Sequence, residues 1–595
     1  MTIKVSDLIA KFLKEKKIEV IFGIIGGANS HIFDSINNLG YTKIVCVHHE
    51  QCAVMAAGAY YRTNGKLSAA IVTAGPGSVN AITGVLCNWA DSIPCLIISG
   101  QEPTKYLNLH SNLRMYGTQG FNIVKFVENI TKFAKTIKNK NEILSFFQEA
   151  YFKTLENRPG PVWLDVPMDI QSSILSIKDL KNFTEPLCEK NINYDINEII
   201  GLINKSERPL VLGGHGIRLS NSQQQFKELI EKLKIPTLLS WSAIDILPFN
   251  NSYYFGISGV YGQRYANFIL QNCDLLIVLG SRLALPQTGY DINNFAPLAK
   301  IIIVNNDNNE LNKYSRYNII INDDCKNFIN RLLTKNINSY KKLWYNRCIK
   351  YKNDFPLIES CHKDTQEYKN SYKFVNNLSK KLRNNHIIAI GQGSPLPCCH
   401  QVLEVKEGQA IFASNGLGEM GNGLPSAIGA AFAGNGKEVI LLDGDGSMMV
   451  NLQELQTIVG YNLPIKIIIF NNNGYLFIKH TQKLFFNGRY TAVSPETGVT
   501  FPDFKRIAYG FNIPYFNDKE NIIEEFLNQK GYAIFEFYMN PEQDLVPKVK
   551  ATVKDDVVIS HPLEDMSPLL PIEIIEKNML KINEISYKIR NLICK

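Results

Sequence analysis

Two polar segments in the last third of the chain combine the residue types that bind a divalent cation. Asp443-Gly444-Asp445-Gly446-Ser447 follows one apolar run, and Asn471-Asn472-Asn473-Gly474 follows another. Asp445 and Asn472 are 27 residues apart, the length of one strand–helix–strand unit. A carboxylate and an amide oxygen can therefore meet at the carboxyl ends of neighbouring parallel strands, where α/β sheets bind ligands. Oxygen ligands of this kind suit Mg²⁺.

The glycines beside Asp445 add a second chemical property. They let a ligand approach the backbone closely, and amides at the start of the following helix can bind phosphate oxygens. A Gly-Asp-Gly turn alone is more often an ordinary strand–helix corner. The asparagine segment at this separation favours a site for a metal-bound diphosphate.

Short apolar segments alternate with helix-length stretches through most of the chain, which is the pattern of parallel sheets covered by helices. The expected strands are 44–47, 69–72, 95–98 and 162–166 in a first block, 209–212, 237–240, 275–279 and 300–304 in a second, and 387–390, 439–442, 465–470 and 533–537 in a third. We predict an α/β protein with three doubly wound parallel-sheet domains at 1–175, 190–335 and 370–548. The tail 549–595 has no strand pattern, and we expect it to pack over the surface or a partner subunit.

Composition excludes several classes of protein. Hydrophobic residues make up 45% and charged residues 20% of the chain, which is typical of globular proteins. The net charge of +8 is modest, and charges of both signs are interspersed, so we expect no nucleic-acid partner. No apolar run approaches the roughly 20 residues that span a bilayer. The 12 cysteines are scattered, which favours reduced thiols and a cytoplasmic location.

The Gly-Asp-Gly-Ser and Asn-Asn segments resemble the signature of thiamine diphosphate enzymes of the acetolactate synthase type. Over roughly residues 1–550 the chain carries further motifs of these enzymes in the same order. They are Phe22-Gly23, Gly26-Gly27-Ala28, Gly75-Pro76-Gly77 with Asn80, Asp91-Ser92-Ile93-Pro94, Ser99-Gly100-Gln101, Arg158-Pro159-Gly160-Pro161-Val162 and the run 416–425. The resemblance implies a pyrimidine-binding, a central and a diphosphate-binding domain.

The resemblance also implies roles for single residues in the third block. Asp445, Asn472 and the carbonyl group of Gly474 would hold Mg²⁺. Residues implied in binding the cofactor are Gln392, Ser394, Gly418, Met420, Gly444, Gly446 and Ser447, together with Asn80 and Arg158 from the first block. Met420 would support the bent cofactor from below, although a methionine here is also compatible with an ordinary core position. A histidine common in the family is Gly393 in this chain.

Glu50 lies in Val47-His48-His49-Glu50-Gln51, at the end of an expected strand and the start of a helix rich in Ala and Gly. An isolated glutamate at this place would usually stabilise the helix N-terminus. The resemblance instead implies that Glu50 hydrogen-bonds the aminopyrimidine ring and so promotes deprotonation of the thiazolium carbon. That task requires a buried carboxyl group without a nearby cation. Gln119 matches a glutamine that lies near the reacting groups in relatives.

The second block leaves its ligand open. Gly256, Gly259, Gly262 and Ala266-Asn267 resemble the FAD-binding stretch of acetolactate synthases, as does Arg158. Two features disagree: Leu283-Ala284-Leu285 replaces the usual Asp-Asp-Arg, and Asn305 replaces an aspartate that meets the ribose. FAD, an ADP-like group and no ligand are all compatible with the sequence.

The departures from the family lie where the second substrate would bind. Acetolactate synthases carry a tryptophan nine residues beyond the metal-binding asparagine, and this chain has Thr481. The loop Leu109–Phe121 is also changed, and its His110 and Arg114 would face either an anionic substrate or solvent. We therefore expect an acceptor site remade for something larger or more polar.

The predicted enzyme, a transferase or lyase, decarboxylates a 2-keto acid with thiamine diphosphate and Mg²⁺. Pyruvate is the expected donor, and the activated aldehyde would pass to an acceptor carbonyl such as a keto-sugar. A simple 2-keto acid decarboxylase is the alternative, and a non-catalytic member that binds a nucleotide or a protein is an alternative of another class. Since the two halves of the site come from two subunits in relatives, we expect a homodimer or homotetramer and no membrane partner.

Overall fold

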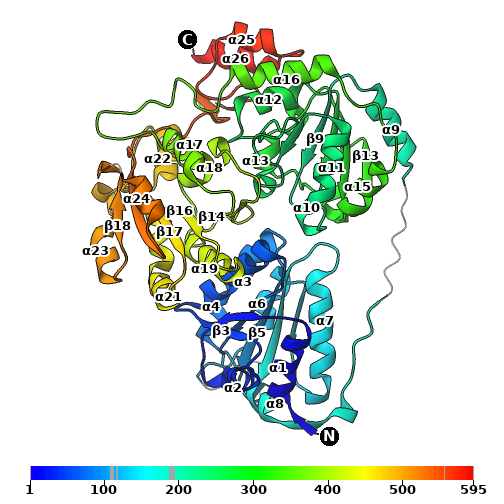
Figure 1. Ribbon diagram of the computed structural model, residues 1–595, viewed down its shortest axis with the longest axis vertical. Coiled ribbons are helices and arrows are strands. Elements are labelled where there is room, and N and C mark those ends of the chain that lie inside the picture. Colours follow the sequence, from blue (N-terminus) through cyan, green and yellow to red (C-terminus); the bar gives the residue numbers. More distant parts are fainter. Residues whose placement is uncertain are drawn as a thin grey trace.

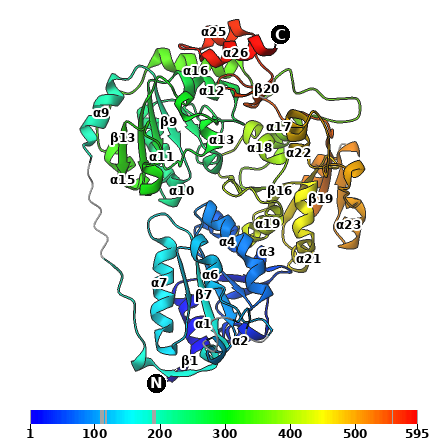
Figure 2. The ribbon, with the colours of Figure 1, turned by 180° about the vertical axis from the view of Figure 1, so that it is seen from behind.

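The computed structural model contains three parallel sheets, each covered by helices (Figure 1). The structure describes residues 2–107, 113–115, 118–186, 194–520, 522–554 and 557–593. Two of the sheets have six strands and one has five, which confirms the predicted fold class. In both views the first domain lies below the other two, with α3 and α4 facing α19 (Figures 1 and 2).

The first sheet has the strand order β3-β2-β4-β5-β7-β6. In that order the strands are β3 (Lys43–Cys46), β2 (Val20–Gly23), β4 (Ala69–Val72), β5 (Cys95–Gln101), β7 (Pro161–Pro167) and β6 (Phe133–Thr136). The helices are α1 (Val5–Glu15), α2 (Ser30–Leu39), α3 (Glu50–Asn64), α4 (Pro76–Ala90), α5 (Thr104–Leu107), α6 (Val124–Val127), α7 (Ile143–Leu155) and α8 (Met168–Ser172). A short pair, β1 (Thr2–Lys4) and β8 (Ile174–Ser176), ties the chain start to the end of this domain.

The second sheet has the order β10-β9-β11-β12-β13. Its strands are β10 (Thr237–Leu239), β9 (Pro209–Gly213), β11 (Leu275–Leu279), β12 (Lys300–Asn305) and β13 (Ile319–Asn322). Its helices are α9 (Ile196–Lys205), α10 (Gly216–Leu219), α11 (Gln223–Leu233), α12 (Arg264–Asn272), α13 (Leu285–Thr288), α14 (Asn308–Leu311) and α15 (Cys325–Leu333), followed by α16 (Lys342–Asp354).

The third sheet has the order β15-β14-β16-β17-β19-β18. Its strands are β15 (Ala410–Ala413), β14 (Ile387–Ile390), β16 (Val439–Gly444), β17 (Ile465–Asn471), β19 (Ala533–Tyr538) and β18 (Tyr515–Asn517). Its helices are α17 (Ser371–Lys381), α18 (Pro395–Val402), α19 (Gly423–Ala433), α20 (Asp445–Met448), α21 (Leu455–Gly460), α22 (Leu476–Phe485), α23 (Phe504–Gly510) and α24 (Ile523–Asn528).

Helices α3 and α19 pack closely and join the cores of the first and third domains. Both helices are rich in small residues, and one cluster of buried side chains includes residues from both. A Cβ atom on Gly429 would lie 2.1 Å from the carbonyl oxygen of Ala56. Glycine is therefore required at this crossing, and α3, which begins with Glu50, is held against the third domain.

The tail corrects one expectation. We predicted no strand after residue 549, but β20 (Ala551–Lys554) and β21 (Val557–Ser560) form an antiparallel pair, followed by α25 (Ile572–Asn578) and α26 (Glu584–Ile593). Each strand has only four residues, too short a run for a strand pattern to be recognised in the sequence. The tail packs on the second domain, where Leu563, Met566 and Ile575 join its core. Within the described residues, no helix is long and apolar enough to cross a membrane.

Candidate active site

The carboxyl ends of β16 and β17 bring Asp445 and Asn472 together. Asp445 begins α20 and is 2% exposed. Its Oδ1 accepts the backbone N–H of Gly446 at 2.8 Å, and its Oδ2 accepts those of Asn472 at 3.1 Å and Gly474 at 3.3 Å. The two segments are thus joined through one carboxylate, as the spacing predicts.

The environment of Asp445 fits a cation. Burial raises the pKa of Asp445 to about 7, although four backbone N–H groups act in the opposite direction. No described Lys, Arg or His forms an ion pair with it. A buried carboxylate without a positive partner is unfavourable. Together with the amide oxygen of Asn472 and the carbonyl oxygen of Gly474, this carboxylate could hold Mg²⁺.

The residues expected at the diphosphate lie around this pair. A Cβ on Gly444 would lie 2.8 Å from the carbonyl oxygen of Gln392, and one on Gly446 would lie 2.4 Å from the Tyr475 ring. The hydroxyl of Ser447 accepts the N–H of Gly421 at 3.0 Å. Ser394 and Asn472 approach within 3.5 Å. Glycine is thus needed at 444 and 446, and the backbone N–H groups of both glycines donate to the neighbouring carboxylates of Asp443 and Asp445.

The loop between β15 and α19 carries Gly418 and Met420. Gly418 has φ +72°, a left-handed conformation that favours glycine, and the Met420 side chain is 42% exposed. Glu419 fixes the loop: its carboxylate accepts Ser414 Oγ at 2.6 Å and Asn422 Nδ2 at 2.7 Å. Met420 is therefore not a core methionine in this chain, and its side chain can touch a ligand.

Glu50 is the first residue of α3, directly after β3, and is 8% exposed. His49 caps this helix by accepting the N–H of Gln51 at 3.1 Å, so Glu50 is not needed as the cap. Its Oε2 accepts Asn80 Nδ2 at 3.1 Å, and a Cβ on Gly77 would lie 3.1 Å from its Oε1. Among the described residues, no cation forms an ion pair with Glu50. Glu50 is thus buried without a cation beside it, which is the environment that the predicted role requires.

Asn80 and Gln119 lie on either side of the Gly75–Gly77 turn. Asn80 belongs to α4 and bonds to Glu50. Gln119 lies over the start of α4, where a Cβ on Gly75 would come within 2.7 Å of the Gln119 Cβ. The structure thus places three of the four predicted site residues of the first domain at this turn, all except Arg158.

The predicted site residues of the first domain are not hydrogen-bonded to those of the third domain in the described part of the chain. His48 donates its backbone N–H to Glu454 at 3.0 Å, which links the base of α3 to the third domain. Among the described residues, neither Glu50 nor Asn80 forms a hydrogen bond with Asp445 or Asn472. The residues predicted to bind the pyrimidine ring and those predicted to bind the diphosphate therefore form separate groups within the described part of one chain.

A cavity of about 180 Å³ lies where the three domains meet. Its walls include Asp91, Arg158, His215, Arg282 and Asn415. Burial lowers the pKa of His215 to about 3, with Arg62 and Arg218 contributing, so this imidazole is neutral. Three buried atoms in the wall have no hydrogen-bond partner among the described residues: Ser258 Oγ, Gln287 Nε2 and Asn415 Oδ1. A polar ligand would satisfy them.

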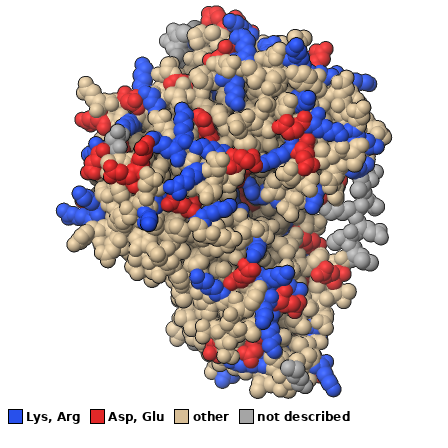
Figure 3. Space-filling model, in the orientation of Figure 1, with Lys and Arg blue, Asp and Glu red and all other residues tan. Residues whose placement is uncertain are grey.

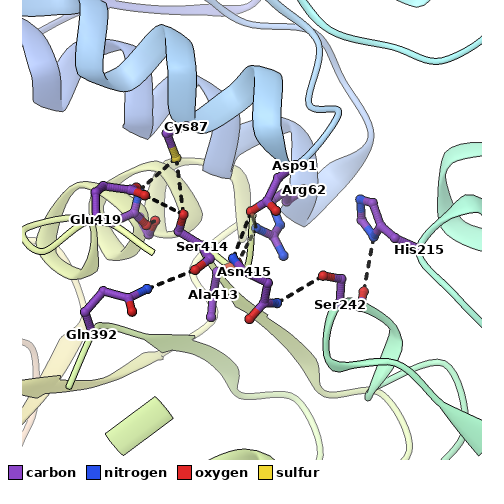
Figure 4. Close-up of polar contacts among 12 residues, drawn as sticks. Arg62, Cys87, Asp91, His215, Ser242, Gln392, Ala413, Ser414, Asn415 and Glu419 are labelled. Atoms are coloured by element: carbon purple, nitrogen blue, oxygen red, sulfur yellow. Dashed lines mark hydrogen bonds and ion pairs between the residues drawn. The ribbon is translucent and has the colours of Figure 1, made fainter. Parts of the chain in front are cut away.

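Figure 4 shows the contacts that join this cavity to the loop between β15 and α19, which carries Gly418 and Met420. Asn415 Nδ2 donates to Ser242 Oγ at 3.0 Å and its backbone N–H to Asp91 at 3.2 Å, while Arg62 donates to Ala413 O at 2.7 Å. Next to Asn415 in the chain, Ser414 accepts a hydrogen bond at its carbonyl oxygen from Gln392 Nε2 at 2.9 Å. The segment 413–419 thus touches both sites.

Arg158, expected at FAD, has other partners. Its Nη1 lies 2.8 Å from Asp307 Oδ2 and 3.0 Å from Glu310 Oε1, and its Nε donates to Ser92 at 2.8 Å. The guanidinium borders the cavity but is neutralised by two carboxylates. Arg282, also on the cavity, forms no ion pair with a described residue.

The departures from the family are placed as follows. Thr481 is exposed on α22, and its hydroxyl donates to the carbonyl oxygen of Phe477 at 3.1 Å. Arg114 is exposed, whereas His110 lies outside the described residues. Sequence reasoning missed Glu419 and the contact between Asp91 and Asn415. A charged residue within a glycine-rich loop was a signal for Glu419, but a contact across 324 residues has no local signal.

Comparison with known families gives three matches along the chain. Models described as the N-terminal TPP binding domain, the central domain and the C-terminal TPP binding domain of thiamine pyrophosphate enzymes match residues 3–126, 196–332 and 391–537. A probable acetolactate synthase large subunit of Methanocaldococcus jannaschii is 31% identical over 86% of this chain and 86% of its own length. The chain belongs to the thiamine pyrophosphate enzyme family.

Two further relatives cover nearly the whole chain. The acetolactate synthase isozyme 1 large subunit of Escherichia coli K12 is 29% identical over 91% of this chain and 95% of its own length. The acetolactate synthase large subunit of Lactococcus lactis is 28% identical over 94% and 96%. This member of the family is therefore a thiamine diphosphate-dependent enzyme with all three domains.

Proposed function

We propose that this enzyme decarboxylates a 2-keto acid, with pyruvate as the donor, and transfers the resulting aldehyde unit to an acceptor carbonyl. The observation that carries the proposal is the pair of half-sites: the buried carboxylate of Asp445 joined to Asn472 and Gly474, and the buried, unpaired carboxylate of Glu50. When bound, thiamine diphosphate supplies a nucleophilic carbon and an electron sink for loss of CO₂.

The residues of the third domain hold and orient the cofactor. Mg²⁺ would lie among Asp445, Asn472 and the carbonyl oxygen of Gly474, and would neutralise the Asp445 carboxylate and the diphosphate. Gly444, Gly446 and Ser447 form the turn that carries Asp445, and Gln392, Ser394 and Gly418 border this turn. Met420 supports the ring system through its exposed side chain.

Glu50 performs the proton chemistry. With the cofactor bound, the carboxyl group of Glu50 would donate a hydrogen bond to the aminopyrimidine ring and so promote activation of the cofactor. Asn80 holds one carboxyl oxygen, and the small surface of Gly77 leaves the other accessible. Gln119, over the same turn, is placed to bind the carbonyl or carboxylate of the substrate.

The active form is proposed to be a homodimer or a dimer of dimers, with each site built from Glu50 of one copy and Asp445 of another. The separation of the half-sites within one chain supports this. Apolar side chains around them are exposed, including Val79, Leu417, Met420, Met449 and Val450. On the face shown in Figure 3, charges of both signs are interspersed, and few lie over α19 and α21. A second copy would cover such a surface.

The acceptor is proposed to be a polar carbonyl compound such as a keto-sugar. Thr481 stands where acetolactate synthases have a tryptophan. The smaller side chain leaves the exposed face of α22 open, shortly after the proposed Mg²⁺-binding segment Asn472–Gly474. In the second domain we propose that the cavity holds FAD or an ADP-like group, since three unpartnered polar atoms line it. An absorbance spectrum of the purified enzyme and mass analysis of what it releases on denaturation distinguish the two.

The direct test is CO₂ release from a panel of 2-keto acids, with and without thiamine diphosphate and Mg²⁺. Cofactor-dependent release from one acid supports the proposal and names the donor. Mass analysis with added aldehydes and ketones then identifies ligation products. Release of free aldehyde with every acceptor would assign a simple decarboxylase, and no release from any acid would contradict the catalytic role.

A further inference from the structure

Helix α22 follows the segment Asn472–Gly474, which is proposed to bind Mg²⁺. Several cations lie on this helix and on the segment after β19. The helix begins at Leu476, two residues after Gly474, and the next residues on one side are Phe477, His480 and Thr481. His480 lies about 6 Å along the helix axis from Leu476. The turn that carries His480 thus follows Gly474 by six residues along the chain.

His480 is nearly buried but unsatisfied. Its side chain is 14% exposed, and neither ring nitrogen has a hydrogen-bond partner among the described residues. The nearest carboxylate oxygen, Asp544 Oδ1, is 3.8 Å from Nε2, beyond hydrogen-bond distance. Buried imidazoles normally bond through at least one nitrogen, so this ring lacks a partner.

Three lysines, Lys548, Lys550 and the exposed Lys483, act on His480 electrostatically. Within the described part of the chain, Lys483, Lys548 and Lys550 form no ion pair and no side-chain hydrogen bond. Lys548 lies 5.9 Å from the centre of the Tyr261 ring, which in turn packs against Phe477 at 6.0 Å. By contrast, Lys479 on the same helix pairs with Glu542. The cluster joins α22 to the segment after β19.

The charges of this cluster do not balance. Burial lowers the pKa of Lys548 to about 8, and Lys550 adds to this effect by repulsion. Burial also lowers the pKa of His480 to about 4, with Lys548 as the next cause, while only Asp544 acts in the opposite direction. One carboxylate therefore faces three ammonium groups and a neutral imidazole that can donate a hydrogen bond.

We propose that His480, Lys548, Lys550 and Lys483 bind a phosphate group of the acceptor, so that the acceptor is a phosphorylated or nucleotide-linked carbonyl sugar. This inference rests on the proposed carboligation. A phosphate or diphosphate carries about two negative charges, which matches the excess of cations better than a single carboxylate does. Lysine binds phosphate as a point charge and tolerates variable geometry. The cofactor's own diphosphate has its cradle at Gly444–Ser447, so this cluster is free for the acceptor.

The test is binding of matched sugars to the enzyme saturated with thiamine diphosphate and Mg²⁺. Calorimetric titrations use fructose, fructose 6-phosphate and uridine diphosphate glucose. We expect the phosphate-bearing probes to bind at least about tenfold more tightly than fructose. Preference for fructose 6-phosphate indicates a terminal sugar phosphate, and preference for the nucleotide sugar indicates a diphosphate link. Equal affinity for all three overturns the inference.

Variants localise the effect. Lys548→Gln and His480→Ala are each expected to lower the affinity for the phosphate-bearing probe about tenfold without changing the affinity for fructose. Lys505→Gln is the matched control, since Lys505 is an exposed lysine of the same domain outside the cluster. An equal loss in Lys505→Gln, or no loss in Lys548→Gln, places the phosphate elsewhere and contradicts the inference.

The outcome is separable from that of the proposed function. CO₂ release from pyruvate in the absence of acceptor requires Glu50 and Asp445 but not the cluster. If release is normal and phosphate discrimination is absent, only the cluster's role fails. If discrimination is present but no 2-keto acid is decarboxylated, the proposed reaction fails and the anion site stands.

Discussion

The packing of α3 on α19 predicts that Gly429→Ala displaces Glu50. The added Cβ would lie 2.1 Å from the Ala56 carbonyl oxygen, and non-bonded carbon and oxygen atoms need about 1 Å more than this. Because this oxygen belongs to the backbone, rotation of a side chain cannot relieve the contact, so the two helices must separate by roughly that amount. Overpacking of this size costs about 1–3 kcal/mol.

The displacement should also affect catalysis, since α3 begins with Glu50. A misplacement of about 1 Å lowers rates on the order of a hundredfold. The control is Gly201→Ala in α9, where a Cβ meets no atom within 4 Å. That variant should gain about 1 kcal/mol from helix propensity and keep full activity. Urea denaturation midpoints and CO₂ release test both variants. A Gly429→Ala enzyme as stable and active as Gly201→Ala would refute the reasoning.

Three further substitutions have distinct expected results. Asp445→Asn removes the charged ligand and should raise the Mg²⁺ concentration needed for half-maximal activity about a hundredfold or more, measured by Mg²⁺ titration; an unchanged requirement would place the metal elsewhere. For Glu419, burial raises the pKa of the carboxyl group, so its contribution to stability is present at low pH and is lost as the pH rises through the folded-state pKa. Glu419→Gln should therefore become more stable relative to the parent between pH 4 and pH 8, followed by denaturant midpoints, and a constant difference across this range would contradict the shift. Thr481→Trp should fill the exposed face of α22 and shift ligation toward small acceptors by about tenfold, measured as the ratio of products from paired acceptors; an unchanged ratio would show that the acceptor does not contact this face.

Much of the fold could be predicted because the central strands are strongly apolar and end at glycine or polar residues. β4 and β11 lie where expected, and β16, β17 and β19 extend the expected runs by one or two residues. Most of the strands that were not predicted are at sheet edges or are short, but β2, a buried interior strand, was missed as well. β18 has three residues, all half-buried, and β6 is an edge strand without a fully buried residue. Partial burial weakens the apolar pattern on which such predictions rest.

The candidate site was predictable where geometry follows from topology. Asp445 and Asn472 had to meet because adjacent parallel strands end at the same edge of a sheet. The partners of Arg158 were not predictable. Asp307 and Glu310 are about 150 positions away, in a different domain, and only the packing of domains brings them to the guanidinium. The same holds for the unpartnered atoms of the central cavity.

Glu50 is proposed to activate the cofactor, and the variant Glu50→Gln tests this role most directly. Glutamine keeps the size of the side chain and can still accept the hydrogen bond from Asn80, but it cannot hold the transferred proton. We expect CO₂ release from the 2-keto acid to fall by about 10²–10⁴-fold while thiamine diphosphate and Mg²⁺ still raise the melting temperature. Undiminished CO₂ release by Glu50→Gln would contradict the account.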